Sequence, residues 1–93
     1  MPDSIKNKVR VIAFQEGDGW IAQCVEYDIA AQGWDLSSVQ RNLSAVLIAE
    51  CDYTTEKHGE PFANIDKAPS YFEQMYDEAE AELEGELDFR IAA

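Results

Sequence analysis

The segment that begins at Asp18 and ends at Gly33 constrains the fold of this chain more than any other. It opens within a Gly-Asp-Gly turn (residues 17–19), and glycine at two positions of that turn allows the positive backbone angles of a hairpin loop. We therefore expect residues 8–15 to pair with residues 20–26 as two antiparallel strands.

A third strand and a helix follow with almost no spare residues. The third strand is expected over residues 29–32, and it ends at Gly33. Asp35 is a good N-cap for a helix over residues 36–57, because its carboxylate can accept hydrogen bonds from the free amide groups of the first turn. Gly59 suits the left-handed position after the last turn. Apolar side chains spaced three and four apart predict one buried stripe on this helix: Leu36, Val39, Leu43, Val46, Leu47 and Cys51.

Both faces of the predicted sheet carry apolar residues. Along the first strand, Val9, Val11 and Ala13 point one way, whereas Ile12 and Phe14 point the other way. A sheet with one solvated face would alternate apolar and polar residues more strictly. We expect the second face to be covered as well, by a later helix or by another subunit.

The C-terminal third predicts a second amphipathic helix over residues 69–84, with Pro69 in its first turn and Gly85 ending it. Residues 60–67 are expected to be irregular or to form a short fourth strand around residues 62–65. Residues 87–91 alternate weakly, as in a short edge strand or a frayed terminus. The expected apolar stripe of this second helix is Phe72, Met75, Tyr76, Ala79 and Leu83.

Length and charge narrow the class of protein. A chain of 93 residues fits one domain, with a core over about residues 8–66. Its 19 acidic and 7 basic side chains give a net charge of −12, which disfavours nucleic acid and anionic membranes and favours basic partners. No apolar run approaches the roughly 20 residues that span a bilayer. We expect a cytoplasmic α+β protein with a three- to four-stranded antiparallel sheet and one long helix packed on it.

The sequence offers few groups for catalysis. Cys24 and Cys51 suit neither a disulfide framework nor a zinc site, so we interpret both as buried apolar groups. His58 lies seven residues, or about 10 Å, from Cys51 along the helix, which leaves only Cys24 as its potential partner. Glu26 and Asp28 form an acidic pair near the end of a strand. No phosphate loop or dinucleotide fingerprint occurs, and we predict no catalytic residue, no cofactor and no metal.

Trp34 stands out as an aromatic residue directly before the helix cap. If it is exposed beside an acidic surface, it is a plausible anchor for a protein partner. The predicted partner-binding residues are therefore Trp34 and the carboxylates of the C-terminal helix: Glu73, Asp77, Glu78, Glu80 and Glu84.

The hairpin, the strand over residues 20–26, the exit at Gly33 and the helix opening resemble the HicB-like antitoxin family. The resemblance covers residues 8–57: a turn of Asp-Gly type followed by an aromatic, a strand of Ala-x-Cys-x-Glu pattern, and a step through glycine into an amphipathic helix. It implies a small antiparallel sheet with one helix packed on it, described as a partial ribonuclease H-like fold. It also implies oligomers that neutralise a small basic HicA-type ribonuclease.

The chain departs from this family in two places. Tyr27-Asp28-Ile29 replaces the Pro-Gly-Cys bend, and the part after His58 is not a DNA-binding module, which removes the basis for operator binding.

Our first hypothesis is a non-enzymatic homodimer that binds and blocks a basic protein. The second is an oligomeric structural or regulatory protein without antitoxin activity, and the third is a metal-dependent hydrolase that uses Glu26 and Asp28.

Overall fold

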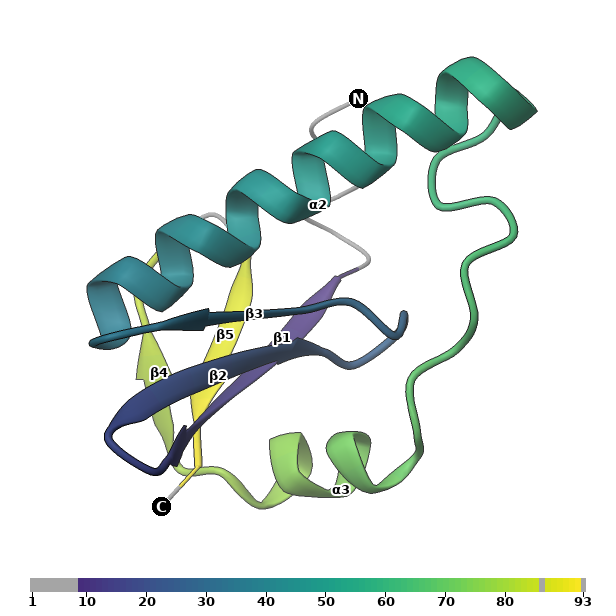
Figure 1. The fold of residues 1–93 in the computed structure, drawn as a ribbon. Helices are drawn as coiled ribbons and strands as arrows, with labels where there is room; N and C mark the ends of the chain where they lie inside the picture. The colour runs from purple at the N-terminus through teal and green to yellow at the C-terminus, as the bar shows by residue number, and fades with distance from the viewer. Residues whose placement is uncertain (1–8, 86, 93) are drawn as a thin grey trace.

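The computed structural model describes residues 9–85 and 87–92, which form an α+β fold with one sheet between two helices (Figure 1). The elements in chain order are strands β1 (Arg10–Glu16), β2 (Gly19–Cys24) and β3 (Ala30–Gly33), helices α2 (Leu36–His58) and α3 (Tyr71–Glu78), and strands β4 (Ala81–Leu83) and β5 (Asp88–Ile91). The predicted start of the first strand at Lys8 lies outside the described residues.

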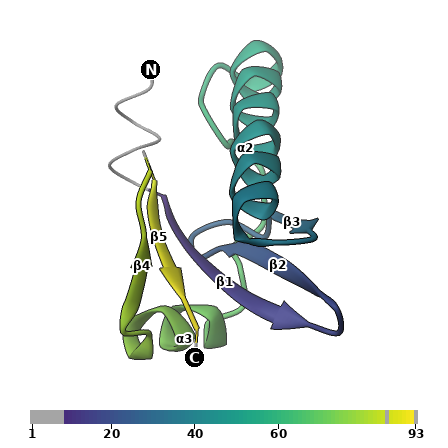
Figure 2. The same cartoon turned by 90° about the vertical axis from the view of Figure 1, so that its left-hand side faces the viewer.

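The sheet has five strands in the order β3-β2-β1-β5-β4. All neighbours are antiparallel except β1 and β5, which are parallel. The expectation of a three- to four-stranded antiparallel sheet is therefore wrong in both number and direction. The strand predicted at the sheet edge over residues 87–91 is internal, because β5 pairs with β1 on one side and with β4 on the other (Figure 2).

Helix α2 confirms the predicted caps and the predicted stripe. Asp35 accepts a hydrogen bond from the Ser38 backbone N–H at 2.8 Å, and the Ser38 hydroxyl in turn accepts from the Asp35 N–H. Gly59 ends the helix with φ of 84°. The helix packs on the β2–β3 side of the sheet, and every stripe residue contributes to one core cluster with Val11, Ala22 and Phe89.

Helix α3 covers the opposite face of the sheet. Phe72 and Tyr76 pack with Ile12 and Val25 in a second, smaller core cluster. The later helix thus provides the cover that the sequence requires for this face.

The predicted helix over residues 69–84 is too long. It ends at Glu78, where Ala79 turns extended with ψ of 138°, and residues 81–83 form strand β4 instead. Like charges at four-residue spacing weaken a helix, whereas β4 gains a ladder with β5. Leu83 consequently packs in the core cluster under α2, and Gly85 is not a helix end.

Residues 59–70 carry the chain from the far end of α2 to the opposite face of the sheet (Figure 1). Residues 62–65 are a turn and not a strand; Phe62 and Asn64 have φ of 62° and 65°. The Phe62 N–H donates to the buried Thr54 hydroxyl at 2.6 Å, and the Phe62 ring stacks on Tyr27. None of the helices in the described part of the chain has the length and apolar character needed to cross a membrane.

Candidate functional site

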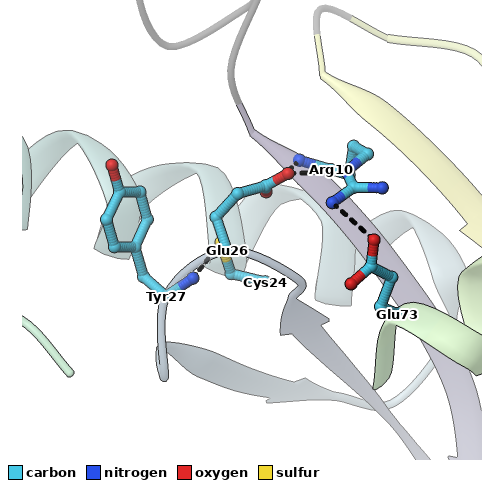
Figure 3. Close-up of polar contacts among 5 residues, drawn as sticks. All are labelled: Arg10, Cys24, Glu26, Tyr27 and Glu73. Carbon is cyan, nitrogen blue, oxygen red and sulfur yellow. Dashed lines mark hydrogen bonds and ion pairs between the residues drawn. The ribbon is translucent and has the colours of Figure 1, made fainter. Parts of the chain in front are cut away.

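The two carboxylates of the acidic pair after β2 are held by separate partners. Glu26 accepts from the Arg10 backbone N–H at 2.8 Å and from Arg10 Nε at 2.5 Å (Figure 3). Asp28 accepts instead from the Gln23 side chain at 3.4 Å. The hydrogen bond to Glu26 is the main cause that raises the pKa of Arg10. Glu26 therefore neutralises a cation and holds the start of β1.

Cys24 is fully buried beneath the turn that contains Glu26 (Figure 3). Its Sγ accepts a hydrogen bond from the Tyr27 N–H at 3.5 Å. Burial raises the pKa of this thiol to about 11, so that it stays protonated at neutral pH. Cys51 is also buried, which confirms both thiols as packing groups, whereas His58 is exposed in the last turn of α2. Within residues 9–85 and 87–92, no three His, Cys, Asp or Glu side chains gather as metal ligands.

The predicted carboxylates of the C-terminal region lie on α3 and on the segments that flank β4. All are exposed; they are Glu73, Asp77, Glu78, Glu80 and Glu84, and we call them the acidic strip. Glu73 is the one member with an ion pair among the described residues, to Arg10 Nη2 at 3.6 Å. Arg90, the basic residue of β5, forms no ion pair with these carboxylates in the described part of the chain. It donates to the Tyr76 carbonyl at 3.0 Å and lies 4.3 Å from the centre of the Tyr76 ring.

Trp34 is the most exposed large apolar side chain of the described residues, with 84% of its surface accessible. It lies at the junction of β3 and α2, beside an open hollow of about 480 Å³. The hollow is lined by the β1–β2 turn, the end of β3 and the first turns of α2. Its side chains include Glu16, Asp18, Trp20 and Asn42. Asn42 closes one rim by donating to the Gln32 carbonyl at 2.8 Å.

The structure separates the predicted partner-binding residues into two groups. Trp34 follows β3 at one edge of the sheet, whereas the acidic strip runs from α3 past β4 at the other edge. The carboxylates that share a hollow with Trp34 are Glu16 and Asp18, which our sequence analysis did not select. The hairpin register could have found them, since antiparallel pairing brings the β1–β2 turn and the end of β3 to the same end of the sheet.

Comparison with known proteins gives no further guide to the function. No protein-family model matches the chain, and it matches no curated protein and no solved structure.

Proposed function

We propose that this protein is a non-enzymatic interaction module that binds and blocks a small basic protein through its acidic surface. The observation that carries this proposal is the acidic strip, which keeps its carboxylates exposed. Apart from Glu73, its members have no cationic partner in the described residues. The HicB-like sequence features favour a HicA-type ribonuclease as the basic protein. We further propose that the module is a homodimer.

The distribution of charge explains why the strip suits a protein partner. A stretch of carboxylates in which only one member is paired with a cation produces a negative potential that attracts a basic surface and accelerates encounter. Arg90 of the neighbouring strand β5 donates to the Tyr76 carbonyl and lies against the Tyr76 ring, and it forms no ion pair with the strip among the described residues. The strip therefore retains its charge for an external cation.

The proposal is tested first by whether a small basic reading frame of HicA type lies beside this gene, and then by measuring affinity for its product and inhibition of RNA cleavage by that product. Affinity should fall at least about tenfold between low and high salt, because exposed charge pairs are screened within about 10 Å at 0.1 M salt. A variant with Asp77→Asn, Glu78→Gln, Glu80→Gln and Glu84→Gln should bind about tenfold more weakly, at roughly 0.3–0.5 kcal/mol for each lost exposed pair.

A matched control removes the same charge elsewhere. Asp52→Asn, Glu56→Gln, Glu60→Gln and Asp66→Asn also remove four exposed carboxylates, yet they lie outside the strip. This control should keep most of the affinity. Equal weakening by both variants, or binding that does not change with salt, would contradict a role for the strip. If no small basic reading frame lies beside the gene, the oligomeric protein without antitoxin activity becomes the better hypothesis.

A further inference from the structure

Trp34 is exposed at a position where an apolar residue usually packs. It directly precedes the N-cap Asp35, and such a residue often contacts the fourth helical residue, here Val39. Val39 is already fully buried in the core cluster under α2, while Trp34 remains 84% accessible. The indole therefore contributes little to folding and is available to a partner.

The base that carries Trp34 is rigid. A Cβ atom on Gly33 would lie 2.5 Å from the Val39 backbone nitrogen, so that only glycine allows this close approach of β3 to α2. The reciprocal hydrogen bonds of Asp35 and Ser38 fix the next turn. A side chain carried on backbone that is already ordered costs less conformational entropy when it binds, because only its own rotamers remain to be fixed.

The hollow beside Trp34 combines aromatic and anionic groups. In the sheet, Glu16 is paired with Gly19 and Trp20 with Gly33, so that the turn and the end of β3 lie side by side. Glu16 and Asp18 are exposed, and neither has an ion pair within the described part of the chain. The hollow is thus lined by two tryptophans and by two residues that carry carboxylates.

We infer that this hollow, formed by Trp34, Trp20, Glu16 and Asp18, is the contact point for an arginine side chain of the basic partner. A guanidinium can stack its plane on an indole while its N–H groups donate to carboxylates. The lysine ammonium is a compact, strongly hydrated charge and gains less from such a surface. The inference rests on the proposed function, because it assigns a specific contact to the same basic protein.

The test uses a short arginine peptide as probe and the Trp34 indole N–H resonance as readout in ¹⁵N-labelled protein. Titration with an acetylated Gly-Arg-Arg-Arg-Gly amide should shift this resonance saturably. The lysine peptide of the same length should bind at least about threefold more weakly. The double variant Glu16→Gln with Asp18→Asn should weaken arginine binding at least about fivefold, whereas Asp52→Asn with Glu56→Gln, which removes equal charge elsewhere, should leave it unchanged.

The outcomes separate this inference from the proposed function. Equal shifts with the arginine and lysine peptides, or equal losses in both double variants, would show diffuse attraction and overturn the inference. If Trp34→Ala leaves affinity for the ribonuclease unchanged while the acidic-strip variant weakens it, the proposed function stands and the arginine contact fails. If the peptide binds at Trp34 but the ribonuclease does not bind at all, the contact stands and the proposed partner is wrong.

Discussion

Arg10 and Glu26 are joined twice, once through the Arg10 side chain and once through its backbone. Arg10 Nε donates to Glu26 Oε2 at 2.5 Å, and the Arg10 N–H donates to Oε1 at 2.8 Å. The Val25 N–H also donates to the Arg10 carbonyl at 2.8 Å. These bonds hold the start of β1 against the end of β2. Arg10 further contacts α3, through Glu73 and through the Tyr76 ring at 5.4 Å.

Replacement of Glu26 by glutamine should therefore destabilise the fold. The amide has a single acceptor oxygen and no charge, so that one of the two hydrogen bonds is lost and the other is no longer charge-assisted. The side chains of Arg10 and Glu26 are 33% and 27% exposed, so that solvent screens this ion pair partly but less than a fully exposed pair. We expect a loss of about 1–2 kcal/mol in the free energy of unfolding, measured by urea denaturation.

Glu73→Gln is the matched control for this prediction. Glu73 also pairs with Arg10, but at 3.6 Å and with its side chain 56% exposed. Its replacement should cost no more than about 0.5 kcal/mol. Equal losses for the two variants would mean that the backbone contact of Glu26 contributes nothing beyond an ordinary surface ion pair.

Thr54→Val should destabilise the turn that follows α2. The Thr54 hydroxyl donates to the Glu50 carbonyl at 2.8 Å and accepts from the Phe62 N–H at 2.6 Å. Valine keeps the shape but leaves the buried Phe62 N–H without an acceptor, which costs about 1–3 kcal/mol. Thermal or urea unfolding should rank the wild type above Thr54→Ser and Thr54→Ser above Thr54→Val. A serine variant no more stable than the valine variant would rule out the hydroxyl as the important group.

Because of Asp35, part of the free energy of unfolding should depend on pH in the acidic range. The Ser38 N–H and hydroxyl hold the pKa of this carboxyl below its ordinary value, so its contribution is present above that value and is lost as the pH falls through the lower folded-state pKa. Asp35→Asn keeps a capping acceptor but cannot titrate. The advantage of the wild type over this variant should therefore shrink as the pH falls below the ordinary pKa range of an aspartate carboxyl. Urea midpoints at each pH provide the measurement.

Asp52→Asn serves as the control for the change in net charge, because it removes one exposed carboxylate from α2 far from the N-cap. The difference in urea midpoint between the wild type and Asp52→Asn should not change with pH in the way that it does for the Asp35 variant. If both variants show the same profile, the pH dependence comes from general charge repulsion and not from the cap.

The N-terminal part of the fold could be predicted because its signals are local. The bounds of the hairpin strands and of α2 were predicted to within one or two residues from a glycine turn, a capping aspartate and a C-terminal glycine. The alternation of side chains along β1 correctly placed Val11 and Ile12 on opposite faces of the sheet. The C-terminal part depends on pairing between distant residues. The spacing of Leu83 fits a continuation of α3 as well as it fits a strand. Residues 81–83 form a strand because they pair with β5, which lies further along the chain.

The same distinction applies to the candidate site. The exposure of Trp34 and of the acidic strip agrees with what their positions beside a helix cap and on the polar side of a helix suggested. The neighbours of Trp34 did not follow from its sequence context. Glu16 and Asp18 reach its hollow through strand register, which joins residues sixteen or more positions apart.

Cys24 should be nearly inert to alkylation while the protein is folded. Burial raises the pKa of its thiol from 9.0 to about 11, and the thiolate is the reactive form. In a Cys51→Ala variant at about pH 8, the higher pKa reduces the thiolate fraction of Cys24 about a hundredfold. Iodoacetamide should therefore react with Cys24 at least that much more slowly in the folded protein than in urea.

The folded state also binds the Cys24 proton more tightly than the unfolded state. The free energy of unfolding should therefore fall as the pH rises from 9.0 to about 11. The Cys24→Ala variant, which keeps Cys51, should lack this alkaline component. Alkylation of folded Cys51→Ala at the rate found in urea would show that Cys24 is accessible and that the β2 end opens readily.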